Sequence, residues 1–308
     1  MKKCFVVESL GSDEYIHMAH AFNLGGQTAY YHDEGDESGY FHTYDTLKLE
    51  NSEQTRKVHV FLPRSYGDHN NYPVVYMNDG NTAFWAGGLS PYSWEVPTVI
   101  SNLYQQSEIQ PVIIVAVHPL NRSYEYLHVE EFSTPFKKEG GGLPEYSNYI
   151  ARLKSFIDLN YKTISDRKST TILGSSHGGL AAFYTGCQYC HLFGNIGALS
   201  PSFWAGGVFN LPSSSLMQTV GQHLNQDNQD RPNLWIDWGC KRSEGFHNFV
   251  IEQQAAKWGR RMSEVLEKQY GYVLGKDLFK YEDKNGGHDE RAWSYRLGLV
   301  LKQFYKTT

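Results

Sequence analysis

Cysteine, positive charge and long apolar runs are all scarce in this chain. Four cysteines among 308 residues are too few for a fold held together by disulfides. The 28 Lys and Arg side chains are outnumbered by 33 Asp and Glu, so no strongly basic face for a nucleic-acid backbone is expected. Apolar runs such as 112–117 are too short to cross a bilayer. We therefore expect neither a nucleic-acid nor a membrane partner, and composition leaves the oligomeric state open.

The N-terminus does not resemble a secretion signal. Its apolar run is short and is interrupted by Glu8, so a cytoplasmic location is expected. Hydrophobic residues make up 40% of the chain, which is enough to build a sizeable core. Aromatic residues make up 15% and suggest ring-lined surfaces or clefts.

The hydrophobic pattern predicts strands along most of the chain. Apolar and polar residues alternate in 47–50 and 58–62, as in half-buried antiparallel strands. The short apolar runs 73–77 and 112–117 suit parallel strands that are covered on both faces. Further strand-like segments are 170–173, 196–199, 234–238 and 278–281.

Helical spacing of apolar residues falls between and after these strands. It predicts helices around 149–157, from about 248 to 266, and around 293–304. Alternating strands and helices indicate an α/β fold with a mostly parallel central sheet and helices on both faces. The two leading antiparallel strands resemble the α/β-hydrolase arrangement. Because no linker separates two parts, we expect a single domain with a core over 43–308 and an N-terminal extension over 1–42.

A candidate nucleophile lies between a predicted strand and a predicted helix. The segment Gly174-Ser-Ser-His-Gly178 fits G-x-S-x-G, a tight turn that lifts a serine above the sheet. The small residues Gly179, Ala181 and Ala182 follow at the start of the helix. Ser176 is therefore the predicted nucleophile, and its hydroxyl needs a nearby base.

The base and its acidic partner should follow Ser176 in the chain. His288, in a Gly-Gly-His segment just before the last helix, is the predicted base, and His247 is the second choice. Glu244, in the loop after Gly239, is the preferred acid, with Asp237 and Asp283 as alternatives.

The predicted oxyanion donors are two backbone N–H groups. One belongs to His177, directly after the serine, and the other to Asn81, in the loop after strand 73–77. Aromatic side chains are expected to line an acyl or aryl pocket: Trp85, Trp94, Phe203 and Trp204.

Five segments together resemble the esterase D-like family of α/β-hydrolases, particularly its enterochelin esterase-like and feruloyl esterase-like members. Residues 72–80 (YPVVYMNDG) resemble the family's "yPvlYmlDG", and 122–126 (RSYEY) resemble "R..Ey". Residues 174–180 (GSSHGGL) resemble "GSSmGGL". Residues 193–204 (FGNIGALSPSFW) and 287–293 (GHDERAW) resemble "FgkagalSPsfW" and "GHnEaaW". The resemblance runs from about residue 44 to the C-terminus.

The resemblance implies a serine esterase with Ser176 as nucleophile and His288 as base. It also implies that Arg122 and Glu125 are partners beneath the site, with Arg122 a candidate for the substrate pocket. Two features depart from the pattern: His177 replaces an apolar residue, and the acid loop is longer than the family's. Residues 1–42 have no counterpart there, and we expect them to cap the cleft.

The resulting hypothesis is a serine carboxylic-ester hydrolase that works through an acyl-enzyme on a small-molecule ester. An acyltransferase on the same fold and a non-catalytic binding protein are the alternatives. No metal or cofactor is expected. The segment Cys187-Gln-Tyr-Cys-His191 matches a haem-attachment pattern, but no export signal accompanies it.

Overall fold

The computed structural model describes residues 20–50, 52–68, 70–87, 91–134, 137–205 and 210–307. The strands are β1 (His20–Leu24), β2 (Gln27–His32), β3 (Gly39–Lys48), β4 (Thr55–Pro63), β5 (Val74–Met77), β6 (Ile113–Val117), β7 (Glu130–Thr134), β8 (Lys137–Gly140), β9 (Thr170–Ser175), β10 (Asn195–Leu199), β11 (Asn233–Gly239) and β12 (Leu278–Asp283). The helices are α1 (Gly80–Ala83), α2 (Val96–Gln105), α3 (Arg122–Glu125), α4 (Leu143–Asn160), α5 (His177–Gln188), α6 (Ser215–Leu224), α7 (Glu252–Gln269) and α8 (Glu290–Tyr305). Short 3-10 turns cover Arg167–Ser169 and Leu211–Ser213, and a π-helical turn, η4 (His247–Ile251), leads into α7.

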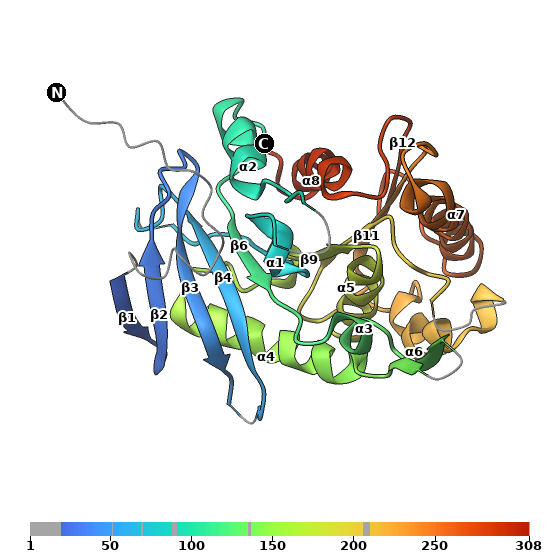
Figure 1. The fold of residues 1–308 in the computed structure, drawn as a ribbon, viewed down its shortest axis with the longest axis horizontal. Helices are drawn as coiled ribbons and strands as arrows, with labels where there is room; N and C mark the ends of the chain where they lie inside the picture. The colour runs from blue at the N-terminus through green and yellow to red at the C-terminus, as the bar shows by residue number, and fades with distance from the viewer. Residues whose placement is uncertain are drawn as a thin grey trace.

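One large sheet organises the molecule (Figure 1). Its ten strands lie in the order β1-β2-β3-β4-β6-β5-β9-β10-β11-β12, and β7 and β8 form a separate hairpin. The six strands from β6 to β12 pair in parallel, whereas β1 to β4 pair antiparallel and β4 is antiparallel to β6. The predicted α/β fold with a mostly parallel sheet is confirmed.

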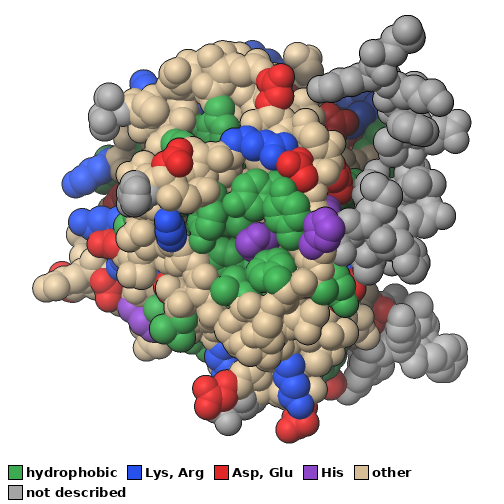
Figure 2. All heavy atoms as spheres, turned by 90° about the vertical axis from the view of Figure 1, so that its left-hand side faces the viewer, with side chains coloured by type: hydrophobic (Ala, Val, Ile, Leu, Met, Phe, Trp, Pro, Cys, Tyr) green, Lys and Arg blue, Asp and Glu red, His purple; other side chains and the backbone are tan. Residues whose placement is uncertain are grey.

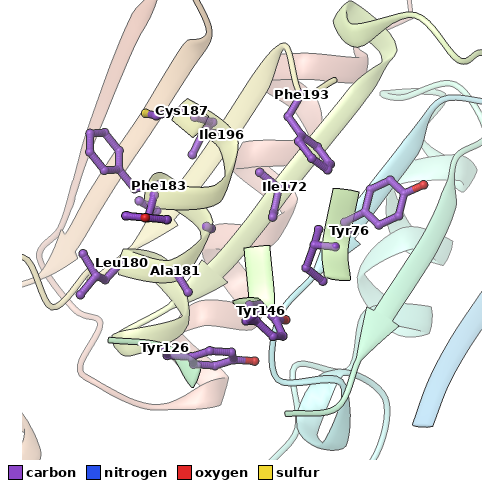
Figure 3. Close-up of a cluster of buried hydrophobic side chains, with 14 of the residues drawn as sticks. Tyr76, Tyr126, Tyr146, Ile172, Leu180, Ala181, Phe183, Cys187, Phe193 and Ile196 are labelled. Carbon is purple, nitrogen blue, oxygen red and sulfur yellow. The ribbon is translucent and has the colours of Figure 1, made fainter. Parts of the chain in front are cut away.

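Helices cover the two faces of the sheet because side chains alternate along each strand. In β5, Val74 and Tyr76 belong to one core cluster with α4, α5, α6 and α7. Val75 and Met77 belong to the other, with α2 and α8. Figure 3 shows the first cluster, where α5 presents Leu180, Ala181 and Phe183 beside the sheet residues Tyr76, Ile172 and Ile196. None of the helices in the described ranges is long and apolar enough to span a bilayer.

The N-terminal extension adds strands to the sheet. Residues 20–42 form β1, β2 and the beginning of β3, at the edge farthest from β12. The predicted strand 47–50 only overlaps the end of β3, since the strand actually begins at Gly39. None of these residues lines the pocket described below, so the described part of the extension does not cap it. Residues 1–19 lie outside the described part, and the single-domain assignment stays a prediction.

Aromatic contacts explain why 20–42 shows no clear alternation. His42 contacts the rings of Phe22, Tyr31, Tyr40 and Tyr161, on the face of these strands that meets the first core cluster. Figure 2 looks at this side of the molecule and shows hydrophobic side chains gathered around a histidine. Burial lowers the pKa of His42 to about 4. Aromatic and histidine rings thus occupy inward-facing positions that aliphatic residues occupy in other strands. The alternation of apolar and polar residues is therefore not visible in the sequence.

The parallel strands bring their carboxyl ends to one edge of the sheet. The segments after β5, β9, β10, β11 and β12 all leave from this edge. In open α/β sheets ligands bind outside this edge. The predicted residues Asn81, Ser176 and His288 all lie on these segments.

Candidate active site

Ser176 sits in a sharp turn between β9 and α5. Its φ and ψ are 55° and −123°, a conformation that non-glycine residues rarely adopt. The turn is tight because a Cβ at position 174 would lie 2.5 Å from the Gly178 carbonyl oxygen. The Ser176 N–H donates to the Leu199 carbonyl at 2.9 Å. Its Oγ lies 3.3 Å from Ser202 Oγ.

His288, in the loop between β12 and α8, is held by four neighbours. Its Nδ1 lies 2.6 Å from Glu252 Oε2, and its backbone N–H donates to Asn248 Oδ1 at 2.6 Å. The Trp293 ring meets the imidazole edge to face, with centroids 5.0 Å apart, and His247 stacks on it at 6.1 Å. The ring orientation is therefore fixed from several sides, and the side chain is only 3% exposed.

The acid beside His288 is Glu252 and not the predicted Glu244. Glu252 is the first residue of α7 and its side chain is fully buried. Its Oε1 accepts hydrogen bonds from Ser200 Oγ, at 3.0 Å, and from the Gly239 N–H. A buried carboxylate needs such donors to compensate for lost hydration.

The three acids named from the sequence have other partners. Glu244 is 59% exposed and pairs with Lys241 at 2.8 Å, which lowers the pKa of the Glu244 carboxyl. Asp237 pairs with Arg296 at 2.6 Å. Asp283 accepts the N–H groups of its own loop, residues 285 and 286. Glu252 carries no local motif, and its only sequence signal is its place near the start of the predicted helix 248–266.

A pocket of about 400 Å³ contains both Ser176 and His288. Asn81 and Arg122 also line it, as expected, and so does Trp94. The complete lining is Asp79, Asn81, Thr82, Pro91, Tyr92, Trp94, Arg122, Ser175, Ser176, Glu244, His247, Asn248, His288, Asp289, Glu290, Arg291 and Trp293. Tyr92, Asn248 and Trp293 are lining residues that the sequence reasoning missed.

Three aromatic residues predicted for the pocket lie elsewhere. Phe203 is fully buried and packs edge-on against Phe183 of α5, at 5.1 Å between centroids. Trp204 packs on the same core cluster. Trp85 donates to Glu34 at 2.9 Å on the side of the molecule toward β2. These predictions were wrong because ring type alone does not tell a core residue from a pocket residue.

Two residues that line the pocket each carry a buried polar atom that lacks a hydrogen-bond partner within the described residues. The two atoms are Trp293 Nε1, a donor, and Asn81 Oδ1, an acceptor. Unpaired buried polar groups are costly.

A salt bridge fixes the loop after β5, where Asn81 lies. Arg122 donates from Nε and Nη2 to the two oxygens of Asp79, at 2.7 and 3.0 Å. The Asp79 N–H donates to the Tyr126 hydroxyl at 2.9 Å, and Asp79 has a φ of 57°. Arg122 therefore supports the first turn of α1, as the family resemblance implied for a residue beneath the site.

His177 presents a neutral ring beside the nucleophile. Burial, with a further contribution from Arg122, lowers the pKa of His177 to about 4. Its backbone begins α5, and the first N–H groups of a helix have no partner within the helix. The His177 N–H is thus suited to a ligand oxygen next to Ser176.

No group of three or more His, Cys, Asp or Glu side chains suited to a metal ion occurs within the described ranges. The two cysteines of the C-x-x-C-H segment carry free, buried thiols. Burial raises the pKa of Cys187 well above its ordinary value. The expectation of no metal and no cofactor stays a prediction.

Comparison with known proteins gives one family and several relatives. The family described as "Putative esterase" matches residues 50–303. YjcH of Bacillus subtilis, an uncharacterized protein, is 29% identical over 245 residues, which are 79% of this chain and 89% of YjcH. YbbA of the same organism, also uncharacterized, is 27% identical over 153 residues, which are 48% of this chain and 58% of YbbA.

Solved structures share the fold at low sequence identity. The BES protein of Bacillus cereus superposes with a TM-score of 0.63 and 20% identity, covering 87% of this chain and 95% of that one. The enterobactin esterase FES of Shigella flexneri gives a TM-score of 0.60 at 17% identity, covering 84% of this chain and 57% of FES. The siderophore hydrolase EstA of Aspergillus nidulans gives 0.57 at 21%, covering 83% and 90%. From the extent of the family match, the chain belongs to the putative esterase family.

Proposed function

We propose that this chain hydrolyses a small carboxylic ester through an acyl-enzyme, with Ser176, His288 and Glu252 as a catalytic triad. The observation that supports this most is the buried His288–Glu252 hydrogen bond in a pocket shared with Ser176. Ser176, Glu252 and His288 follow one another in the chain order expected of the fold, which is serine, acid and histidine. Their roles correspond to nucleophile, orienting acid and base.

The hydrogen-bond directions at His288 suit a general base. A buried carboxylate only accepts, so the imidazole proton is assigned to Nδ1 and points at Glu252. Nε2 is then an acceptor on the pocket side of the ring. In the proposed first step, Ser176 Oγ attacks the ester carbonyl while its proton passes to Nε2. Glu252 stabilises the imidazolium that forms, and this proton then goes to the leaving alcohol.

Backbone N–H groups of His177 and Asn81 are the proposed donors to the tetrahedral oxyanion. His177 is the first residue of α5, and Asn81 is the second residue of α1. The Asp79–Arg122 salt bridge keeps α1 in place. In the second step a water molecule, activated by His288, releases the acyl group and restores the serine.

The pocket favours an ester with an aromatic, polar group. The rings of Trp94 and Trp293 lie 5.8 Å apart and both line the pocket. A ring that carries hydroxyl or carbonyl groups would pack on the tryptophans, and its polar groups would meet the polar lining residues Asn81, Thr82 and Arg122.

The test is the turnover of p-nitrophenyl acetate by Ser176→Ala. Loss of on the order of 10³-fold or more in kcat is expected, since triad members act as a unit. Ser202→Ala is the matched control because it removes the hydroxyl 3.3 Å away, and it should retain most of its turnover. Unchanged turnover in Ser176→Ala would contradict the proposal. Product analysis with a competing alcohol separates hydrolysis from acyl transfer.

A further inference from the structure

A buried ion pair lies behind the proposed triad. Arg296 of α8 and Asp237, near the end of β11, both have side chains with no exposed surface. Nη1 of Arg296 donates to Asp237 Oδ1 at 2.6 Å. The Trp235 indole donates to the other oxygen at 2.8 Å. Neither residue lines the pocket, so neither touches a substrate there.

Ser200 connects this ion pair to the acid of the triad. Its hydroxyl lies 3.0 Å from Arg296 Nη1 and 3.0 Å from Glu252 Oε1. Arginine only donates and carboxylate only accepts, so the hydroxyl accepts from Arg296 and donates to Glu252. The Ser200 backbone has a φ of 41°, which places this hydroxyl between the two charges.

The same guanidinium supports the loop that carries His288. Nη2 of Arg296 donates to the carbonyl of Gly287 at 3.1 Å, and Gly287 directly precedes His288. Nε of Arg296 donates to the Ala292 carbonyl within α8 at 3.2 Å. The same Nε lies 3.8 Å from Asp283 Oδ2. Arg296 is therefore bonded toward both the acid and the base.

We propose that Arg296, Asp237 and Ser200 are positioning residues, which hold Glu252 and set the net charge that His288 faces. The inference rests on the proposed function. Three carboxylates, those of Asp237, Glu252 and Asp283, lie around the single guanidinium of Arg296. The cluster is therefore net negative and favours the imidazolium that His288 forms during catalysis.

Substitutions at Arg296, Asp237 or Ser200 leave the other titratable and charged residues around His288 in the chain. Glu252 from α7, His247 from η4 and His177 from α5 face the imidazole or lie near it. The remaining charged groups of the pocket are Asp79, Arg122, Glu244, Asp289, Glu290 and Arg291. Burial raises the pKa of Asp237 to about 6, against the opposing effect of Arg296, so Asp237 is ionised at and above neutral pH.

The test is the pH dependence of kcat/KM for Asp237→Asn. Removal of one buried negative charge makes the imidazolium less favourable. The acid limb of the kcat/KM profile should therefore shift to lower pH, by about one pH unit if the charge acts at close range. Glu282→Gln is the matched control, since it removes a carboxylate that is 44% exposed from β12, and its limb should stay in place.

Ser200→Gly tests the hydroxyl that connects Arg296 to Glu252, at a position whose positive φ favours glycine. Glycine accepts a positive φ without strain, so the fold is retained while the hydroxyl is lost. We expect kcat to fall about tenfold, as for a lost hydrogen bond to a charged group, with KM unchanged. A kcat of Ser200→Gly within twofold of the wild type would overturn the inference. An acid limb of the kcat/KM profile that stays in place in a folded Asp237→Asn protein would also overturn it.

The two proposals fail separately. If Ser176→Ala abolishes turnover while the Asp237→Asn limb stays in place, only the positioning role is wrong. If turnover survives in Ser176→Ala, the proposed triad is wrong, and the positioning role fails with it.

Discussion

Burial decides which carboxylate can serve His288. Glu252 has no exposed surface, and every bond to its Oε1 comes from a fixed donor, Ser200 Oγ or the Gly239 N–H. Glu244 lines the pocket that contains His288, but it extends into solvent beside Lys241. A solvated carboxylate is screened and mobile, so it orients an imidazole poorly.

Glutamine substitutions at these two positions should therefore differ sharply. Glu252→Gln keeps the shape of the side chain but removes the charge that stabilises the imidazolium. A fall in kcat of on the order of 10³–10⁴-fold is expected, as for amide substitution of other triad acids. Glu244→Gln, the matched control, should leave kcat nearly unchanged. Steady-state assays with p-nitrophenyl acetate measure both, and equal losses would contradict the assignment of Glu252.

The turn between β9 and α5 is the element on which the site depends. Gly174 and Gly178 approach each other so closely that a Cβ at 174 would lie 2.5 Å from a backbone oxygen. A Cβ at 178 would lie 2.7 Å from Asp79 Oδ2, in the salt bridge that holds α1. The geometry at Ser176 and the neighbouring oxyanion loop are thus built from the same contacts.

Alanine at Gly174 should lower both the free energy of unfolding and the activity. The added methyl must displace backbone, at a cost of about 1–3 kcal/mol for overpacking. Gly298 is the matched control, because it lies inside α8 and its nearest neighbour to a new Cβ is Val99 at 3.7 Å. Gly298→Ala should stabilise by about 0.5–1 kcal/mol. Urea unfolding measures both, and a stable, active Gly174→Ala enzyme would refute this account of the turn.

Short sequence patterns predicted the strands, helices and motifs better than they predicted the contacts between these elements. Ser176 and His288 each lie in a glycine-rich segment whose chemistry is readable in a few residues, and the structure brings both to one pocket. Glu252 is recognisable only once α7 is packed against the sheet, because a helical glutamate is usually solvated. Phe203 and Trp204 show the same limit for aromatic residues, whose burial depends on neighbours far along the chain.

At the scale of the whole molecule, the sheet joins two structurally different halves. The parallel half, β6-β5-β9-β10-β11-β12, carries the candidate site at its carboxyl edge. The antiparallel half, β1 to β4, is rich in buried or half-buried histidines: His42, His59 and the nearby His118. His59 bonds to Thr43 at 2.8 Å and to His118 at 3.0 Å, so a polar chain crosses these strands.

These histidines predict a loss of stability in mild acid. Burial lowers the pKa of His42 and of His118 to about 4, and that of His59 well below 6.5. The unfolded chain takes up protons first, so stability is full above pH 6.5 and falls as the pH drops toward 4. Each histidine contributes about 1.4 kcal/mol per pH unit in this window.

Urea unfolding at a series of pH values between neutrality and mild acid measures this effect. His42→Gln should make the decline shallower, whereas His20→Gln, at an exposed position, should leave its slope unchanged. A free energy of unfolding that stays constant across the window would show that these histidines are not held neutral.

The most direct test of the central claim is to locate the nucleophile chemically. The wild-type protein is treated with a fluorophosphonate, and the modified residue is identified by peptide mass spectrometry. The account predicts one adduct per chain, on Ser176, with esterase activity lost in proportion and labelling greatly slowed in Glu252→Gln. An adduct on another residue such as Ser202, or full activity after complete labelling of Ser176, would contradict it.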